Sequence, residues 1–201
     1  MADASRPADA RVQSPEPTVD AHLPVPAVPD VAWPMDLRTG EPRRPWSAWA
    51  GGALLFAAAA LITVALLLVM WDSIRRFPEA SWFNRVTPTN LGDPLRILLA
   101  VGDFAIAVAI AAPATIAGYY GWAGYRWARV AALIALVLGG GSFALNWLAP
   151  WVLLPLALGA LALWAPPTGR YFSAWHGVRH PAPRPEPEAE TVRYGPLPRY
   201  R

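Results

Sequence analysis

The chain has 201 residues, of which 55% are hydrophobic, and its formal net charge is +3, with 17 arginines and no lysine against 14 acidic residues. Cysteine is also absent, which excludes disulfides, thiolate nucleophiles and cysteine-based metal sites. The arginines are scattered and form no basic patch, so no nucleic-acid partner is expected. Exclusive use of arginine, with abundant Ala, Gly and Pro, indicates a GC-rich genome and favours a bacterial source.

The chain begins with a polar segment, residues 1–45, that is rich in proline and charge. Such a segment cannot bury enough apolar surface to offset the entropy lost on ordering. The sequence therefore predicts a disordered, Pro-rich tail that ends where the first apolar tract begins.

Three long tracts with almost no charge follow, at 46–71, 97–120 and 130–167. A helix needs about 20 apolar residues to cross a hydrocarbon core about 30 Å thick. The first two tracts are each one span, whereas the third is too long for one helix and suits a hairpin of two. The sequence predicts an all-α integral membrane protein whose compact bundle has four transmembrane helices, at about 46–71, 94–120, 128–148 and 151–167.

The loop between the first two predicted spans covers residues 72–93. Asp93 before Pro94 is a good helix cap followed by proline at the first helical position, so the second span is expected to start there. Residues 78–83 have two alternatives. They form either a short helix lying on the outer leaflet with its aromatic side chains in lipid, or an irregular loop packed on the helix ends.

Arginines near the predicted spans favour one orientation. Four spans place both termini on the same side of the membrane. The arginines on that side are Arg38, Arg43, Arg44, Arg126, Arg129, Arg170, Arg179 and Arg184, and those on the other side are Arg75, Arg76, Arg85 and Arg96. Because cytoplasmic loops carry the excess of positive charge, the chain is expected to be a multi-pass protein of the bacterial plasma (inner) membrane with both termini cytoplasmic.

Aromatic residues mark the ends of the predicted spans. Rings with a polar edge favour the headgroup region, so tryptophans at span ends are interpreted as lipid-interface anchors rather than as a sugar or quinone site. The anchors are Trp46, Trp71, Trp122, Trp127, Trp151 and Trp164.

Asp103 is the only charged residue inside the three apolar tracts 46–71, 97–120 and 130–167. It lies nine residues after Pro94, about 13 Å along the helix, and so near the bilayer midplane. Small residues share its helical face and large ones occupy the opposite face, which predicts that Asp103 faces the bundle interior. Thr63 and Ser142 are expected at the same depth, and the three form the candidate intramembrane polar site.

Two interpretations of this site remain. Asp103 could handle protons or cations, or it could be a neutral carboxyl group that ties helices together through Thr63 or Ser142. No Arg, Lys or His is expected in this layer, which favours the neutral form. The structural role is preferred, because proton pumps usually contain chains of ionisable groups.

The end of the chain, residues 168–201, is predicted to be a disordered, basic and Pro-rich cytoplasmic tail. It contains His176 and His180, whose spacing suits one helix face, but no acidic third ligand is near in sequence. No metal site and no cofactor are therefore expected.

No catalytic constellation stands out in the sequence. The main hypothesis is a non-enzymatic accessory or scaffold subunit of a membrane complex. Its partners would be the lipid bilayer and either other membrane proteins or further copies of the chain. The alternative is a small oligomeric transporter or channel subunit that uses Asp103. A membrane enzyme is less favoured, because the acidic residues near an interface are spread over one loop.

Overall fold

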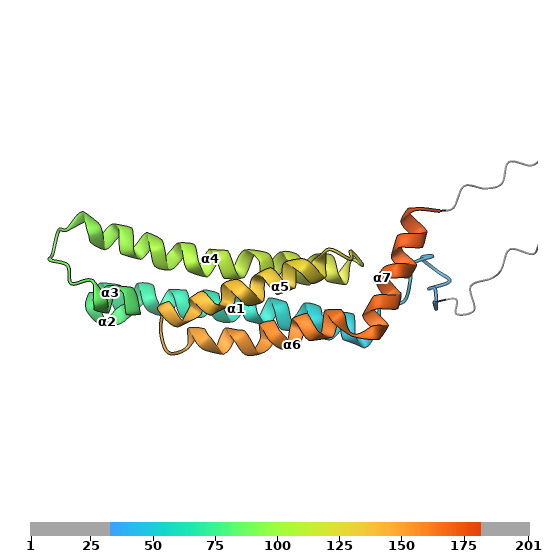
Figure 1. Ribbon diagram of the computed structural model, residues 1–201, viewed down its shortest axis with the longest axis horizontal. Coiled ribbons are helices and arrows are strands. Elements are labelled where there is room, and N and C mark those ends of the chain that lie inside the picture. Colours follow the sequence, from blue (N-terminus) through green and yellow to red (C-terminus); the bar gives the residue numbers. More distant parts are fainter. Residues whose placement is uncertain (1–32, 182–201) are drawn as a thin grey trace, which may run out of the picture. The chain divides into compact units, whose positions relative to one another are not determined.

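The computed structural model describes residues 33–181, whose secondary structure is helical apart from one β-bridge between Met35 and Pro42. In chain order the helices are α1 (Trp46–Arg75), α2 (Phe77–Ala80), α3 (Trp82–Val86), α4 (Pro94–Trp122), α5 (Ala128–Gly139), α6 (Leu153–Trp164) and α7 (Pro166–Arg179); two 3₁₀ turns, η1 (Gly140–Ala144) and η2 (Ala149–Val152), join α5 to α6 (Figure 1).

The long helices α1 and α4 pack against each other along glycines. A Cβ atom on Gly118 would lie 3.3 Å from the carbonyl oxygen of Gly52, and one on Gly52 would lie 3.4 Å from the carbonyl oxygen of Gly118. Larger residues at these two positions would push the backbones apart. The small-residue face predicted for α4 is therefore the face that packs.

The hairpin of α5 and α6 packs on the two long helices. Leu163 of α6 is fully buried, and a Cβ atom on either Gly51 or Gly121 would approach its side chain to 3.0 Å. One leucine thus fills the space that two glycines leave. Gly159 lies against Leu55 of α1 in a similar way, since a Cβ there would be 2.9 Å from the leucine Cγ.

The tip of this hairpin ends well before α1 does. At the tip, the Asn146 side-chain amide donates to the carbonyl oxygen of Ala65 at 2.9 Å, and α1 continues from Ala65 to Arg75, a rise of about 15 Å. Helices α2 and α3 fold back over the tip, where the Trp82 backbone N–H donates to the Leu145 carbonyl oxygen at 3.3 Å. Residues 77–86 thus form short helices packed on the bundle end.

By length and composition, α1 and α4 could each cross a membrane. A third crossing could come from residues 149–164 together with α7, a pair bent by 59°. The prediction of four spans is therefore supported in part, as two or three helices. Helices α5 and α6 are too short to count as spans by themselves, because they have 12 residues each and rise only about 18 Å. The α-helices stop at Gly139 and begin again at Leu153, with 3₁₀ turns between them.

Residues 166–179 form the helix α7, whereas the sequence predicts a disordered tail from residue 168. The helix is held by two buried rings, Tyr171 and Phe172, and by the Tyr171 hydroxyl, which donates to the Trp122 carbonyl oxygen at 2.7 Å. These contacts supply the burial that the tail composition alone does not indicate. Residues 33–45 of the predicted disordered N-terminal tail also have defined structure: Met35 and Pro42 form a β-bridge, and the Trp33 indole N–H donates to the Arg43 carbonyl oxygen at 2.9 Å. Residues 1–32 and 182–201 of the predicted tails lie outside the described residues.

Candidate functional site

Asp103 is completely buried, which confirms that it faces the bundle interior. The small residues that share its face, Ala107 and Ala114, are buried as well, whereas Leu98 and Val101 on the opposite face are more than half exposed. The backbone of α4 therefore holds the carboxyl group against its neighbours. The carboxyl group is therefore not exposed at the surface of the bundle.

The Ser81 side chain, at the start of α3, lies close to this carboxyl group. The Ser81 hydroxyl accepts a hydrogen bond from the backbone N–H of Asn84 at 3.2 Å, which caps α3. Its own proton remains free to point toward Asp103. Within residues 33–181 neither carboxylate oxygen of Asp103 takes part in a regular hydrogen bond. The folded-back loop thus brings a hydroxyl donor to the buried acid.

Ser142 and Thr63, the other predicted members of the site, have different surroundings. Ser142 is buried on η1, which packs against both α3 and α4, and its hydroxyl has no hydrogen-bond partner in the described part of the chain. Thr63 is exposed, and its hydroxyl donates to the carbonyl oxygen of Ala59 one turn earlier at 2.7 Å. The structure therefore does not bring Thr63 to the buried polar side chains.

Two buried polar residues, Ser81 and Asn84, are absent from the sequence-based site. The side-chain amide of Asn84 is buried and unpartnered within 33–181. Ser81 and Asn84 are the uncharged polar residues of segment 77–86, whose other residues are apolar or charged, and this contrast is the available signal. This contrast predicts that Ser81 and Asn84 point into the bundle only when the short length of the α5–α6 hairpin is known. The hairpin ends early, and the loop occupies the space beyond its tip.

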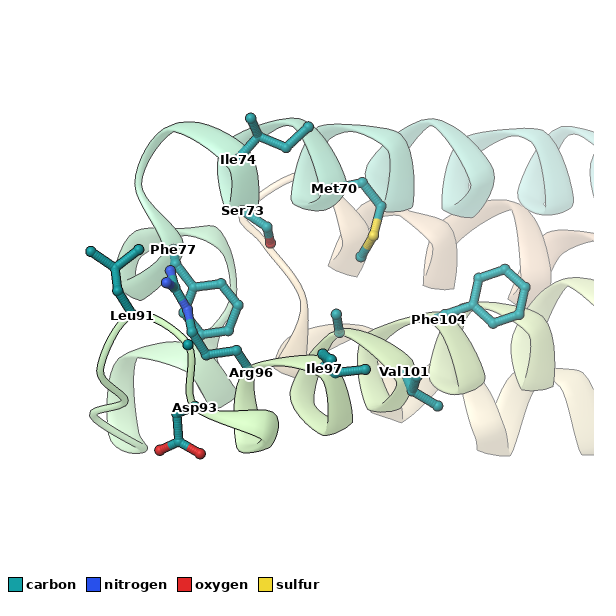
Figure 2. A pocket seen from close by; sticks show the side chains of 12 residues that line it. Met70, Ser73, Ile74, Phe77, Leu91, Asp93, Arg96, Ile97, Val101 and Phe104 are labelled. Atoms are coloured by element: carbon teal, nitrogen blue, oxygen red, sulfur yellow. The ribbon is translucent and has the colours of Figure 1, made fainter.

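A groove of about 820 Å³ lies between α1 and α4 near the same end of the bundle (Figure 2). Met70 and Ser73 point from α1 toward α4, and Phe77 closes the end nearest the loop. Apolar side chains make up most of its walls. The full lining is Met70, Ser73, Ile74, Phe77, Leu91, Gly92, Asp93, Arg96, Ile97, Ala100, Val101 and Phe104.

Arg96 is the cation of this groove. Its guanidinium carbon lies 4.1 Å from the centre of the Phe77 ring. The ion pairs found in the described part of the chain join Arg44 to Glu41 and Arg76 to Glu79, and Arg96 belongs to neither. The charge of Arg96 is thus stacked on an aromatic face and unpaired by any described carboxylate.

The opposite end of the bundle holds α7 in place through backbone carbonyl groups. Arg179 donates to the carbonyl oxygens of Ala123 and Gly124, and its guanidinium carbon lies 4.6 Å from the Trp175 ring centre. Burial raises the pKa of the Tyr171 hydroxyl, so this phenol stays protonated and remains a donor. These groups are occupied in fixing α7.

Five of the six predicted interface tryptophans are exposed at helix ends. Trp122 differs, because it is partly buried, its ring lies 5.6 Å from that of Trp49, and Arg44 stacks over it at 4.9 Å. It therefore packs within the bundle end. The exposed members are Trp46, Trp71, Trp127, Trp151 and Trp164.

His176 and His180 lie on one face of α7, with ring centres 4.4 Å apart. Over residues 33–181, no group of three His, Cys, Asp or Glu side chains is placed to hold a metal ion. Comparison with protein-family models, with curated proteins and with solved structures finds no match to this chain. Functional arguments therefore rest on the geometry above.

Proposed function

We propose that the chain is a four-span protein of the bacterial plasma membrane that serves as a non-enzymatic accessory or scaffold subunit of a membrane complex. The observation that carries the accessory role is the enclosure of Asp103, whose side chain is completely buried behind the folded-back loop. A carboxyl group in that position suits a hydrogen bond between α4 and the loop better than repeated exchange of ions.

The 3₁₀ turns support four spans rather than three. A 3₁₀ turn rises about 2.0 Å per residue, so α5 with η1 extends about 28 Å and η2 with α6 about 26 Å. These lengths approach the hydrocarbon core of about 30 Å. The triple glycine and the prolines end the α-helices, so the α-helical part of each hairpin arm is short. The 3₁₀ turns at these positions then add length to each arm.

The arginine distribution supports cytoplasmic termini in this proposal. Six arginines lie at the end of the bundle that holds α7, against four at the loop end; the six are Arg43, Arg44, Arg126, Arg129, Arg170 and Arg179. Helix α7 mixes polar residues with aromatic and small apolar ones, so it suits the membrane surface, where its bend of 59° relative to the preceding helix would lay it beside the headgroups.

A transporter or channel subunit is the second candidate, and unpartnered polar atoms favour it. Both oxygens of Asp103, the side-chain amide of Asn84 and the hydroxyl of Ser142 are buried without a partner in the described residues. Buried polar groups of this kind need an explanation, and a bound proton or small cation would provide one.

Crosslinked affinity purification from native membranes, with a tag at the C-terminus, separates the two functions. An accessory subunit should recover one other membrane protein in constant ratio, in cells that express the chain at its natural level. Recovery of the chain with itself alone would contradict the accessory role. Proton flux in liposomes that the wild type supports and Asp103→Asn abolishes would then establish the second candidate.

A further inference from the structure

The groove between α1 and α4 has the dimensions of one lipid chain. From Asp93 to Phe104, α4 rises about 16 Å, close to half of the hydrocarbon core and so to the depth of one leaflet. Its lining includes Met70, Ile97 and Val101 and is mainly apolar. If α1 and α4 cross the membrane as proposed, the molecules that reach this groove are lipids.

The polar groups of the groove lie toward its loop end. Arg96 is unpaired by any described carboxylate, and Ser73, which points into the groove, has a buried hydroxyl without a partner in residues 33–181. Asp93 points away from Arg96, and its carboxylate accepts a hydrogen bond from the Leu95 backbone N–H at 2.9 Å (Figure 2). The side-chain donors that line the groove at this end are therefore those of Arg96 and Ser73.

We infer that this groove binds one phospholipid, with an acyl chain along Met70, Val101 and Phe104 and its phosphate at Arg96. A phospholipid carries a phosphate and ester carbonyl oxygens next to its chains, and these acceptors match the Arg96 guanidinium and the Ser73 hydroxyl in chemistry and order. The inference rests on the proposed membrane crossing of α1 and α4, and it is independent of the accessory role.

The test uses the full chain in vesicles of phosphatidylcholine with a minor fraction of phosphatidylglycerol that carries a photoactivatable acyl chain. Crosslinked residues are mapped by mass spectrometry. Labelling should concentrate on the groove side chains of α1 and α4. Arg96→Gln should lower that labelling about fivefold, because one arginine near a lipid surface is worth about 1 kcal/mol. Arg75→Gln, at the same end but outside the groove, should leave it unchanged.

A second variant blocks the chain-binding part of the groove and leaves its charge intact. Ala100→Phe places a ring in the groove and should remove labelling there. Ile116→Phe, on the exposed face of α4 away from the groove, is the matched control and should not. Thermal unfolding of each variant reports whether the bundle is intact.

Equal labelling of all exposed apolar positions, unchanged by Arg96→Gln and Ala100→Phe, would overturn the inference in favour of ordinary surrounding lipid. Extraction of the wild-type chain from membranes by alkaline carbonate would instead contradict the membrane crossing itself. The two failures are therefore distinguishable. Retention in the membrane with groove-specific labelling supports both.

Discussion

The carboxyl group of Asp103 is fully buried, and the hydroxyl of Ser81 lies close to it. Burying a charge without a partner is far more costly than burying a neutral group that shares a hydrogen bond. The neutral acid is therefore the form that fits this environment. A neutral carboxyl group can both donate and accept, so it can link α4 to the loop that covers it.

Replacement of Asp103 by Asn should leave the fold almost unchanged, because the amide has nearly the same shape and also donates and accepts. Asp103→Ala should lower the free energy of unfolding by about 1–3 kcal/mol, since it removes the polar group beside the Ser81 hydroxyl and opens a small void. Thermal unfolding in detergent measures both. A loss with Asn as large as the loss with Ala would argue that a charged or ion-bound carboxylate is required.

Sequence patterns predict that the Asp103 side chain faces the bundle interior, but they do not predict which residues surround it. The alternation of small and large residues along α4 is local information, and burial of Asp103 follows from it. The expectation for Thr63 used depth alone, and depth does not say which way a side chain points around a helix. Ser81 and Asn84 reach the site through a chain reversal that depends on the length of a distant hairpin, which local periodicity does not contain.

At the scale of elements, close backbone approach joins α1 to α4. Gly118→Val should lower stability by about 1–3 kcal/mol, because its side chain would overlap the Gly52 carbonyl oxygen and the Leu55 side chain. Gly102→Val on the same helix is the matched control, since nothing lies within 4 Å of a Cβ there. Thermal unfolding of the pair isolates packing from helix propensity. Equal effects would contradict the proposed helix contact.

The attachment of α7 depends on a glycine with positive φ. Gly124 has φ of 83° and lies directly against the Trp175 ring, so Gly124→Ala combines backbone strain of about 1–2 kcal/mol with displacement of that ring. We expect α7 to detach and trypsin to cleave faster after Arg179. Gly177→Ala, which has free space around it, should not change the cleavage rate. Unchanged cleavage in both variants would mean that α7 does not depend on this turn.

The element boundaries could be predicted where apolar tracts are long and flanked by clear caps. The start of α4 at Pro94, after the Asp93 cap, is confirmed. In the hairpin, Gly139 and Pro150 interrupt apolar runs that hydropathy treats as continuous, and the change from α-helix to 3₁₀ turn has no hydropathy signal. Helix α7 was not predictable from composition, because its stability comes from two rings buried against other elements.

At the scale of the whole molecule, the proposed membrane arrangement depends on the lengths of two long helices and a shorter hairpin. The long helices rise about 45 Å and about 43 Å, more than the hydrocarbon core, whereas the hairpin arms match it only with their 3₁₀ turns included. The folded-back loop occupies the remaining space above the hairpin tip. Four crossings therefore require the tip of the α5–α6 hairpin, at Trp147, to lie on the same side of the membrane as the loop between α1 and α4.

Labelling of single introduced cysteines with a membrane-impermeant maleimide tests this claim most directly, because the natural chain has no cysteine of its own. Asn90→Cys in the loop, Trp147→Cys at the hairpin tip and Ser173→Cys on α7 all replace exposed residues. In intact spheroplasts the first two should be labelled, and Ser173→Cys should react only after permeabilisation. The reverse pattern would overturn the orientation but keep four spans. Labelling of Trp147→Cys together with Ser173→Cys, or only after the membrane is dissolved, would contradict the four-span arrangement.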